Sequence, residues 1–342
     1  MDIIIVKRGS AGDVLRTTSI LRALKDAYPA SSIYWLVDEV NTAVLDNNPY
    51  LKRLFPSERK LPEGIGSKKF DLAINLDNDT VSSSFTSMLK ARDKKGFGLD
   101  AEGEVVPLDG NALRWHEMAL SDELKKSNTR TYHDIIHEIA GLPGNLNRPV
   151  LALRREALER ASEFYEKKGL SGEKVVAVNL GGGGRWENKS PSARKWILII
   201  KDMLENTGAK CLVLGGRKEE DKYSSVTGFF GDRVAGAGTR NSFAELAAII
   251  GLSDAVVTGD TLALHAANAL DKHTVVLFGP TSAPEIELYG RGTKILPEMD
   301  CLCCYREKCG RRPNCMDLLP ESTITGAVKD ALDENHGNTS DI

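Results

Sequence analysis

The feature that most limits how this chain can fold is a set of short, unbroken apolar runs, each followed by a glycine-containing turn. The runs "DIIIVK" (2–7) and "KVVAVNL" (174–180) are two of them, and "CLVLGG", "DAVVTGD" and "TVVLFG" follow later. A strand without polar alternation is buried on both faces, as in parallel sheets that helices cover on both sides. Amphipathic segments separate the runs, so we predict an α/β layer fold.

The strand-helix pattern occurs twice along the 342 residues. Between the two halves lies "GLPGNLNRPVLAL" (141–153), a stretch rich in glycine, proline and asparagine. We therefore predict two Rossmann-like domains, residues 1–152 and 153–330, followed by a polar tail at 331–342. Ligands of such folds bind beyond the carboxyl ends of the strands, which places the turns at 9–13, 181–189, 215–219 and 259–265 around one crevice.

Charge and composition exclude two classes of protein. A net charge of -3 and a pI near 6.1 disfavour a nucleic-acid binder, which normally carries a basic excess. No apolar run reaches the length needed to span a bilayer, and the N-terminus lacks the regions of a signal peptide. We expect a cytoplasmic protein that can contact the inner face of the inner membrane.

The first glycine turn, "KRGSAGDVLRTT" (7–18), holds a carboxylate between an apolar strand and an apolar helix face. Asp13 there is either a helix cap or a general base, and one role does not exclude the other. Lys7, Arg8 and Arg16 lie near it in sequence. They either contact an anionic acceptor or are solvated surface charges, the commoner fate of such residues.

Two turns in the second half suit a phosphate group. "NLGGGGRWENK" (179–189) follows a strand and precedes a helix, so its amides and Lys189 can meet a diphosphate, although it lacks P-loop and dinucleotide spacing. In "TGDTLALHAANAL" (258–270), Asp260, Thr261 and His265 cluster at a helix start. The alternatives are a flexible loop, a capping aspartate and a structural histidine.

Five of the six cysteines crowd into "CLCCYREKCGRRPNC" (301–315), whereas Cys211 stands in an apolar strand. Clustered thiols in a reducing compartment more often bind metal than form disulfides. Four of them supply a tetrahedral set for structural zinc or iron: Cys301, Cys304, Cys309 and Cys315. The alternative is a reduced cluster without metal.

In their order along the chain, "SAGDVL", Lys189, "GDTLALHAANAL" and "VVLFGPTSAPE" resemble the motifs of glycosyltransferase family 9, the ADP-heptose:lipopolysaccharide heptosyltransferases. The resemblance extends from residue 7 to about residue 315. It implies the GT-B fold, with an acceptor site in the N-terminal domain, a nucleotide-sugar site in the C-terminal domain, and inverting chemistry that needs no metal. Some relatives that glycosylate proteins carry a cysteine-bound iron, which favours the metal alternative for the cysteine cluster.

The resemblance also implies roles for individual residues. Asp13 matches the catalytic base, and Lys7 and Arg16 lie on the acceptor side. The positions that match donor-binding residues are Gly182, Gly183, Lys189, Glu219, Asp260, Thr261 and His265, with Glu220 as the alternative to Glu219. Leu262 stands where the family usually has glycine, and Arg16 where it commonly has histidine.

The sequence thus predicts an inverting glycosyltransferase that moves heptose from ADP-heptose to an anionic glycolipid or glycan, such as a lipopolysaccharide core. Three alternatives stay open: a relative that uses another nucleotide sugar or glycosylates a protein, a non-catalytic nucleotide-sugar binder, and a nucleotide-dependent oxidoreductase. The absence of a GxGxxG turn disfavours the oxidoreductase. We expect no cofactor in the chemistry.

Overall fold

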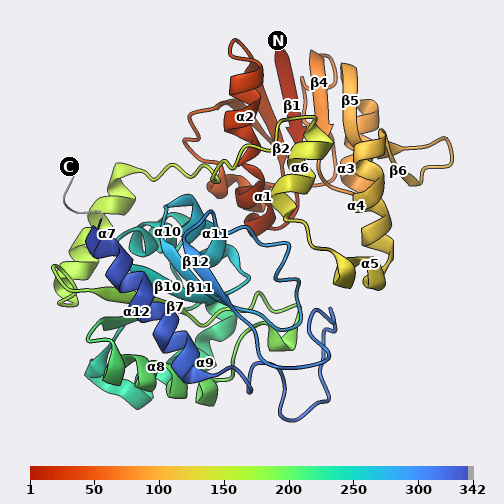
Figure 1. Ribbon diagram of the computed structural model, residues 1–342. Helices are drawn as coiled ribbons and strands as arrows, with labels where there is room; N and C mark the ends of the chain where they lie inside the picture. Colours follow the sequence, from red (N-terminus) through yellow and green to blue (C-terminus); the bar gives the residue numbers. More distant parts are fainter. Residues whose placement is uncertain (338–342) are drawn as a thin grey trace. The chain divides into compact units, whose positions relative to one another are not determined.

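The computed structural model describes residues 1–337, and the chain divides into two compact units, Met1–Ala152 and Leu153–Ile342 (Figure 1). Each unit has one six-stranded sheet with helices against it. The predicted α/β fold with two Rossmann-like units is therefore confirmed. No helix within residues 1–337 combines the length and apolar character needed to cross a membrane.

The first unit is built on a sheet of order β3-β2-β1-β4-β5-β6. Its strands are β1 (Asp2–Val6), β2 (Ser32–Val37), β3 (Leu51–Pro56), β4 (Lys69–Asn75), β5 (Lys90–Leu99) and β6 (Val105–Pro107). Its helices are α1 (Ala11–Thr17), α2 (Ile20–Ala27), η1 (Glu39–Val44), α3 (Thr80–Met88), α4 (Gly110–Leu120), α5 (Asp122–Ser127) and α6 (Tyr132–Ala140). Only the pairing of β6 with β5 is antiparallel.

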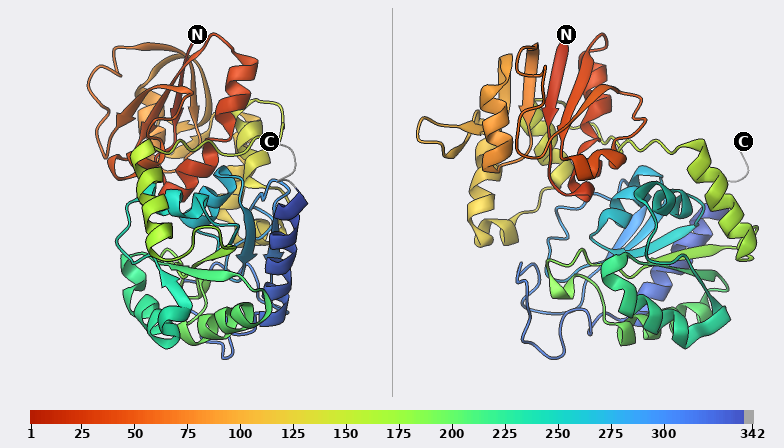
Figure 2. Two further views of the ribbon diagram at one scale, coloured as in Figure 1. Left: turned by 90° about the vertical axis from the view of Figure 1, so that its left-hand side faces the viewer. Right: turned by 180° about the vertical axis from the view of Figure 1, so that it is seen from behind.

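Helices on both sides explain the unbroken apolar run of β1. Its Ile4 and Val6 pack with Phe85 and Leu89 of the α3 segment, and α1, α2 and α6 form a second packed group (Figure 2). Ile3, Ile4 and Ile5 are completely buried. The strand therefore needs no polar residue along its length.

The stretch from Val14 to Tyr28 has apolar residues at helical spacing, as one continuous helix would, but it forms two helices, α1 and α2. The hydroxyl of Thr17 donates to the carbonyl oxygen of Asp13 at 2.6 Å, and that of Thr18 donates to Leu15 at 2.6 Å. Such side-chain bonds compete with the helical backbone pattern. The break leaves α1 as a separate short helix directly after β1.

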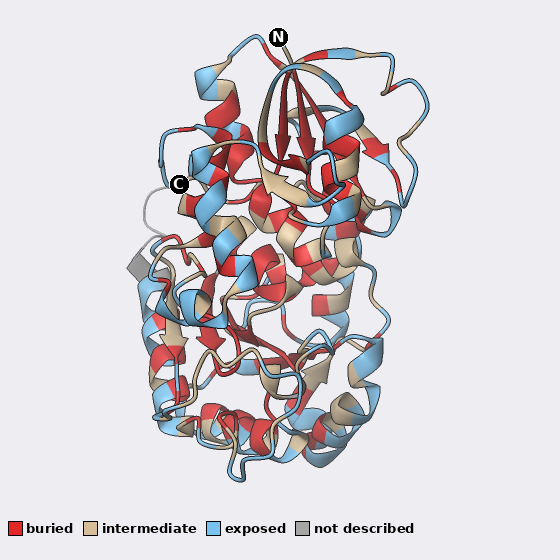
Figure 3. Cartoon of the chain, turned by 90° about the vertical axis from the view of Figure 1, so that its right-hand side faces the viewer, coloured by how far each residue is buried: buried red, intermediate tan, exposed pale blue. Residues whose placement is uncertain are grey.

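The second unit has the same strand order as the first, and all its strands are parallel: β12-β11-β10-β7-β8-β9. The strands are β7 (Val175–Asn179), β8 (Lys210–Leu214), β9 (Val234–Gly236), β10 (Ala255–Gly259), β11 (His273–Leu277) and β12 (Gly292–Ile295). The helices are α7 (Arg155–Lys167), η2 (Glu187–Lys189), α8 (Ala193–Asn206), η3 (Arg217–Glu219), α9 (Glu220–Phe230), η4 (Gly231–Arg233), α10 (Phe243–Gly251), α11 (Leu262–Ala269) and α12 (Glu321–Gly337). Figure 3 shows the buried strands as continuous red segments.

The predicted tail begins too early. Helix α12 runs from Glu321 to Gly337, and its residues Ile324, Val328 and Leu332 pack into the core of the second unit beside α8. Ala331 is completely buried. The stretch is polar in composition because charged residues stand between these positions, although the helix buries its apolar side. Residues 338–342 of the predicted tail lie outside the described residues.

Candidate active site

In each unit, the strand order marks the place where a ligand would bind. In each, the strand order reverses at one pair of neighbours, β1 and β4 in the first unit and β7 and β10 in the second. In open α/β sheets, ligands bind beyond the carboxyl ends of the strands at this reversal. The polar residues that follow these four strands are therefore the candidates for chemistry.

Asp13 lies in the first turn of α1, directly beyond β1. The hydroxyl of Ser10, the N-cap residue, donates to Asp13 Oδ2 at 2.8 Å, and Arg16 Nη2 lies 2.7 Å from Asp13 Oδ1. The Asp13 side chain is still 35% exposed. Ser10 also accepts the bond from the Asp13 amide, so Ser10, and not Asp13, caps the helix. The carboxylate is thus fixed in direction and open to a ligand.

Arg16 is itself held against an aromatic ring. Its guanidinium carbon lies 3.6 Å from the centroid of the Tyr132 ring, close enough for a cation–π interaction. The Tyr132 hydroxyl forms a 2.9 Å hydrogen bond with Thr17. The Tyr132 ring of α6 therefore holds the Arg16 guanidinium in place, and the guanidinium in turn orients the Asp13 carboxylate.

Lys7 has a different place from the predicted one. It is buried, with Nζ 2.5 Å from Asp77 Oδ1 and donating to the carbonyl oxygen of Leu76 at 3.4 Å. Burial acts to lower the pKa of the Lys7 ammonium, but the nearby Asp77, Tyr132 and Asp13 outweigh it and the pKa is raised. An ammonium buried in this way holds the loops after β1 and β4 together, and this arrangement does not present it to an acceptor.

In the second unit, Lys189 and Asp260 come together from the segments after β7 and β10, with Nζ 3.0 Å from Oδ2. Gly259 makes this approach possible: a Cβ atom there would lie 2.6 Å from the carbonyl oxygen of Lys189. His265 Nε2 lies 3.8 Å from the other oxygen of Asp260. The side chains of Lys189, Asp260 and His265 thus form one cluster, as the sequence indicated.

Thr261 occupies the N-cap position of α11. The alternative role considered for Asp260, that of helix cap, is therefore wrong. Its hydroxyl accepts a bond from Asn179 Nδ2 at 3.1 Å, and it lies 3.1 Å from the hydroxyl of Thr258. Asn179 also donates to Thr258 at 3.0 Å. No side chain caps α11, so its first amides stay available to an anion.

The glycine-rich loop runs beside the same cluster. Gly183 and Gly184 have φ angles of +76° and +79°, which L side chains rarely adopt. A Cβ atom on Gly182 would lie 3.2 Å from the Cβ atom of Ser190, and one on Gly184 would lie 3.2 Å from Lys218 Nζ. Loop and lysine are therefore closely packed, which adds a second ammonium to the phosphate-binding candidates.

Of the two glutamates considered for a ribose, Glu219 has the better position. Its Oε2 accepts a bond from the Gly216 amide at 3.1 Å, directly after β8, whereas Glu220 is exposed and lies 3.7 Å from Arg240. Strand β8 is the neighbour of β7 in the sheet. Glu219 is thus next to the glycine-rich loop, and its contact with a ribose stays a prediction.

The four cysteines chosen for a metal do not form a site. Within residues 1–337, no three His, Cys, Asp or Glu side chains are arranged so that they could hold a metal ion. Burial, together with the nearby Cys304, Cys309 and Cys301, raises the pKa of the Cys315 thiol to about 11. Cys315 is therefore a protonated thiol in a packed cluster, and the predicted zinc or iron site does not fit this geometry.

Sequence reasoning missed three side chains of this site, Asp77, Asn179 and Lys218. The first two share one feature: Asp77 lies two residues after the end of β4, and Asn179 is the last residue of β7. A polar residue that ends an unbroken apolar run is the signal that could have found them. Lys218 had no signal of its own, because its contact with Gly184 depends on how two loops pack.

Comparison with known proteins gives one consistent result. The sequence model of glycosyltransferase family 9 (heptosyltransferase) matches residues 58–313. Lipopolysaccharide heptosyltransferase 1 of Pseudomonas aeruginosa is 24% identical over 331 residues, which cover 92% of this chain and 88% of that protein.

Two solved structures share the fold. A family 9 glycosyl transferase from Veillonella parvula has a TM-score of 0.75 at 20% identity and covers 97% of both chains. ADP-heptose lipopolysaccharide heptosyltransferase II of E. coli has a TM-score of 0.71 at 18% identity, over 98% of this chain and 100% of that one. At these identities the likeness establishes the two-domain architecture.

Proposed function

The chain belongs to glycosyltransferase family 9, and from this membership and the site geometry we propose that it transfers heptose from ADP-heptose to a sugar of a lipopolysaccharide core or similar glycan, with inversion. The observation that carries the proposal is the cluster of Lys189, Asp260 and His265 at the strand reversal of the second unit. The names of the relatives support the choice of donor and acceptor.

The donor diphosphate is proposed to lie over the glycine-rich loop. Lys189 Nζ, the loop amides and the uncapped start of α11 offer positive charge and hydrogen-bond donors where the leaving group gains negative charge. Asp260 holds Lys189 in place, and Asn179 fixes the Thr261 hydroxyl. Glu219 is proposed to accept from the ribose hydroxyls, because a carboxylate can accept two such bonds.

The acceptor is proposed to bind at the first unit, with Asp13 as general base. As the acceptor oxygen attacks the anomeric carbon, its proton passes to Asp13 and the bond from that carbon to the diphosphate breaks, releasing ADP. Arg16 and Ser10 hold the carboxylate in one orientation before the transfer. Because the attack comes from the face opposite the leaving group, the configuration inverts.

Substitution of the base separates binding from chemistry. Asp13→Asn keeps the size of the side chain but cannot take a proton, so turnover is expected to fall by about 10²- to 10⁴-fold. ADP affinity, measured by titration calorimetry, is expected to stay unchanged because Lys189, Asp260 and His265, the donor cluster, belong to the other unit. Undiminished turnover in the variant would remove Asp13 from the mechanism.

The identity of the donor has its own measurement. ADP is expected to raise the melting temperature more than UDP or GDP at equal concentration, since a ligand at free concentration c stabilises the folded state by RT ln(1 + c/Kd) and the tighter ligand has the lower Kd. Proton NMR of the product then gives the anomeric configuration. A stronger effect of UDP or GDP would favour a relative that uses another nucleotide sugar, and binding without transfer would favour a non-catalytic binder.

A further inference from the structure

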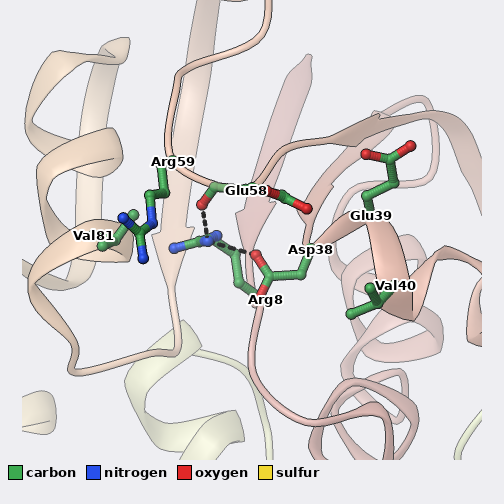
Figure 4. A pocket seen from close by; sticks show the side chains of 7 residues that line it. All are labelled: Arg8, Asp38, Glu39, Val40, Glu58, Arg59 and Val81. Atoms are coloured by element: carbon green, nitrogen blue, oxygen red, sulfur yellow. Dashed lines mark hydrogen bonds and ion pairs between the residues drawn. The ribbon is translucent and has the colours of Figure 1, made fainter.

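A pocket of about 280 Å³ opens in the first unit beyond the ends of β1 and β2 (Figure 4). This volume is just below the usual range for small-molecule sites, roughly 300–1,000 Å³, and suits a single sugar ring better than an oligosaccharide. The residues that line it are Arg8, Asp38, Glu39, Val40, Glu58, Arg59 and Val81.

Arg8 forms a fixed part of this pocket. Its side chain is only 9% exposed, and Nη2 lies 2.5 Å from Asp38 Oδ1 and donates to the carbonyl oxygen of Glu58. Its backbone amide donates to Asp77 Oδ2 at 2.5 Å. Nε is buried without a hydrogen-bond partner, and Nη1 is 3.9 Å from Asp79, beyond hydrogen-bond distance. The guanidinium is therefore held in place by Asp38, by the Glu58 carbonyl oxygen and by the ring of Phe85, whose centroid lies 5.1 Å from the guanidinium carbon.

The charges of the lining disfavour an anion. Two guanidinium groups, Arg8 and Arg59, meet three carboxylates, Asp38, Glu39 and Glu58, so the lining has one negative charge in excess. Burial raises the pKa of the Asp38 carboxyl, and Arg8 offsets this only in part. An anionic ligand would be repelled by these carboxylates. The hydroxyl groups of a neutral ligand can donate to the carboxylates and accept from the guanidinium groups.

We propose that this pocket binds an uncharged, hydroxyl-rich sugar ring of the acceptor. The inference rests on the proposed function, in which the first unit binds the acceptor. Val40 and Val81 offer apolar contacts for the C–H face of the ring. The pocket differs from the anionic acceptor site that the sequence predicted, because Lys7 is buried against Asp77 and Arg16 is paired with Asp13.

Hydrogen bonds also connect the pocket to the loop before Asp13, the proposed base. Asn41 of η1 donates to the carbonyl oxygens of Arg8 at 2.9 Å and Gly9 at 2.5 Å. Arg8 is thus fixed from both sides, only five residues before Asp13. A ring held in this pocket belongs to the same rigid part of the first unit as the proposed base.

The test compares methyl β-D-glucoside with methyl β-D-glucuronide, which differ only at C6, a hydroxymethyl group in the first and a carboxylate in the second. Their binding to the full-length protein is measured by saturation-transfer NMR. The glucoside is expected to bind, and the glucuronide to bind about tenfold more weakly. Asp38→Asn is expected to weaken glucoside binding by about tenfold, the effect of one lost charge-assisted hydrogen bond. Glu63→Gln, which removes an exposed carboxylate outside the pocket, is expected to change nothing.

A second variant is designed to gain binding of the glucuronide, because a folding defect could cause a loss of binding but not a gain. Replacing both Glu39 and Glu58 by lysine turns the excess negative charge into an excess positive charge, so the preference is expected to shift to the glucuronide. Equal or tighter glucuronide binding by the wild type, no glucoside binding, or variants without effect would overturn the inference. ADP binding, measured on the same samples, reports separately on the proposed function, since a failure there leaves the sugar result in place.

Discussion

At Gly259, the absence of a side chain is what lets two loops meet. The backbone of Lys189 passes so close to this glycine that a Cβ atom would lie 2.6 Å from its carbonyl oxygen. The contact is backbone against β-carbon, so no side chain can rotate away to relieve it. The ion pair between Lys189 and Asp260 depends on this close approach.

We therefore expect Gly259→Ala to push η2 away from β10, to cost about 1–3 kcal/mol of stability and to weaken ADP binding. Thermal melting and calorimetric titration with ADP measure the two effects. Gly228→Ala is the matched control, because nothing lies within 4 Å of its added Cβ atom and it sits inside α9. Wild-type ADP affinity in Gly259→Ala would show that the donor cluster does not need this contact.

How far single residues could be predicted depends on whether their role is local. Asp13 and Lys189 follow strands that are evident from the sequence, so their positions at strand ends were predictable. Lys7 was not, since its burial against Asp77 joins loops 70 residues apart. The metal site at the cysteines was predicted from their spacing and from the family resemblance, and neither fixes the direction in which a thiol points.

At the scale of elements, the central strands β1, β7, β8, β10 and β11 were predictable because each is an apolar run that ends at a glycine or polar turn. Strand β5 was not, because its first half is charged and partly exposed. The helix boundaries were also less predictable. The stretch from Val14 to Tyr28 divides at Thr18 and Ser19, where the hydroxyl of Thr18 donates to the carbonyl oxygen of Leu15. The far end of α12 reads as polar, because its few apolar residues are spaced for one buried side.

Helix α6 carries a pair of stacked histidines that makes it sensitive to pH. The rings of His133 and His137 have centroids 4.0 Å apart, and His137 Nδ1 lies 2.8 Å from the carbonyl oxygen of His133. Burial, together with the charge of the neighbouring His133 ring, lowers the pKa of the His137 imidazole to about 4. The unfolded chain, with an ordinary histidine pKa, binds a proton at a higher pH than the folded one.

Stability should therefore be fully present above about pH 6.5 and fall as the pH decreases towards 4. The expected loss from His137 between pH 7 and pH 5 is about 2 kcal/mol. His137→Gln keeps a donor for the His133 carbonyl but does not titrate, so its urea unfolding should show a smaller loss over this interval. Equal losses in wild type and variant would contradict the assignment to His137.

At the scale of the molecule, the chain repeats one sheet order in two units, each with its own core. The repeat was predictable, because both halves show the same succession of apolar runs and glycine turns. In the proposed function, each unit binds one substrate at its own strand reversal. The donor cluster and the glycine-rich loop belong to the second unit, and Asp13 and the Arg8 pocket to the first.

Hydrogen exchange tests this division directly. A ligand slows exchange most in the segments that it stabilises by contact, so ADP at saturation is expected to protect residues 180–190 and 258–265 most strongly. Residues 7–17, around Asp13, are expected to change less. Lys189→Met should abolish the ADP effect at both segments of the second unit, whereas Lys201→Met, at an exposed position on α8, should preserve it. Strongest protection at residues 7–17 would instead place the nucleotide on the first unit, and the assignment of donor and acceptor would have to be reversed.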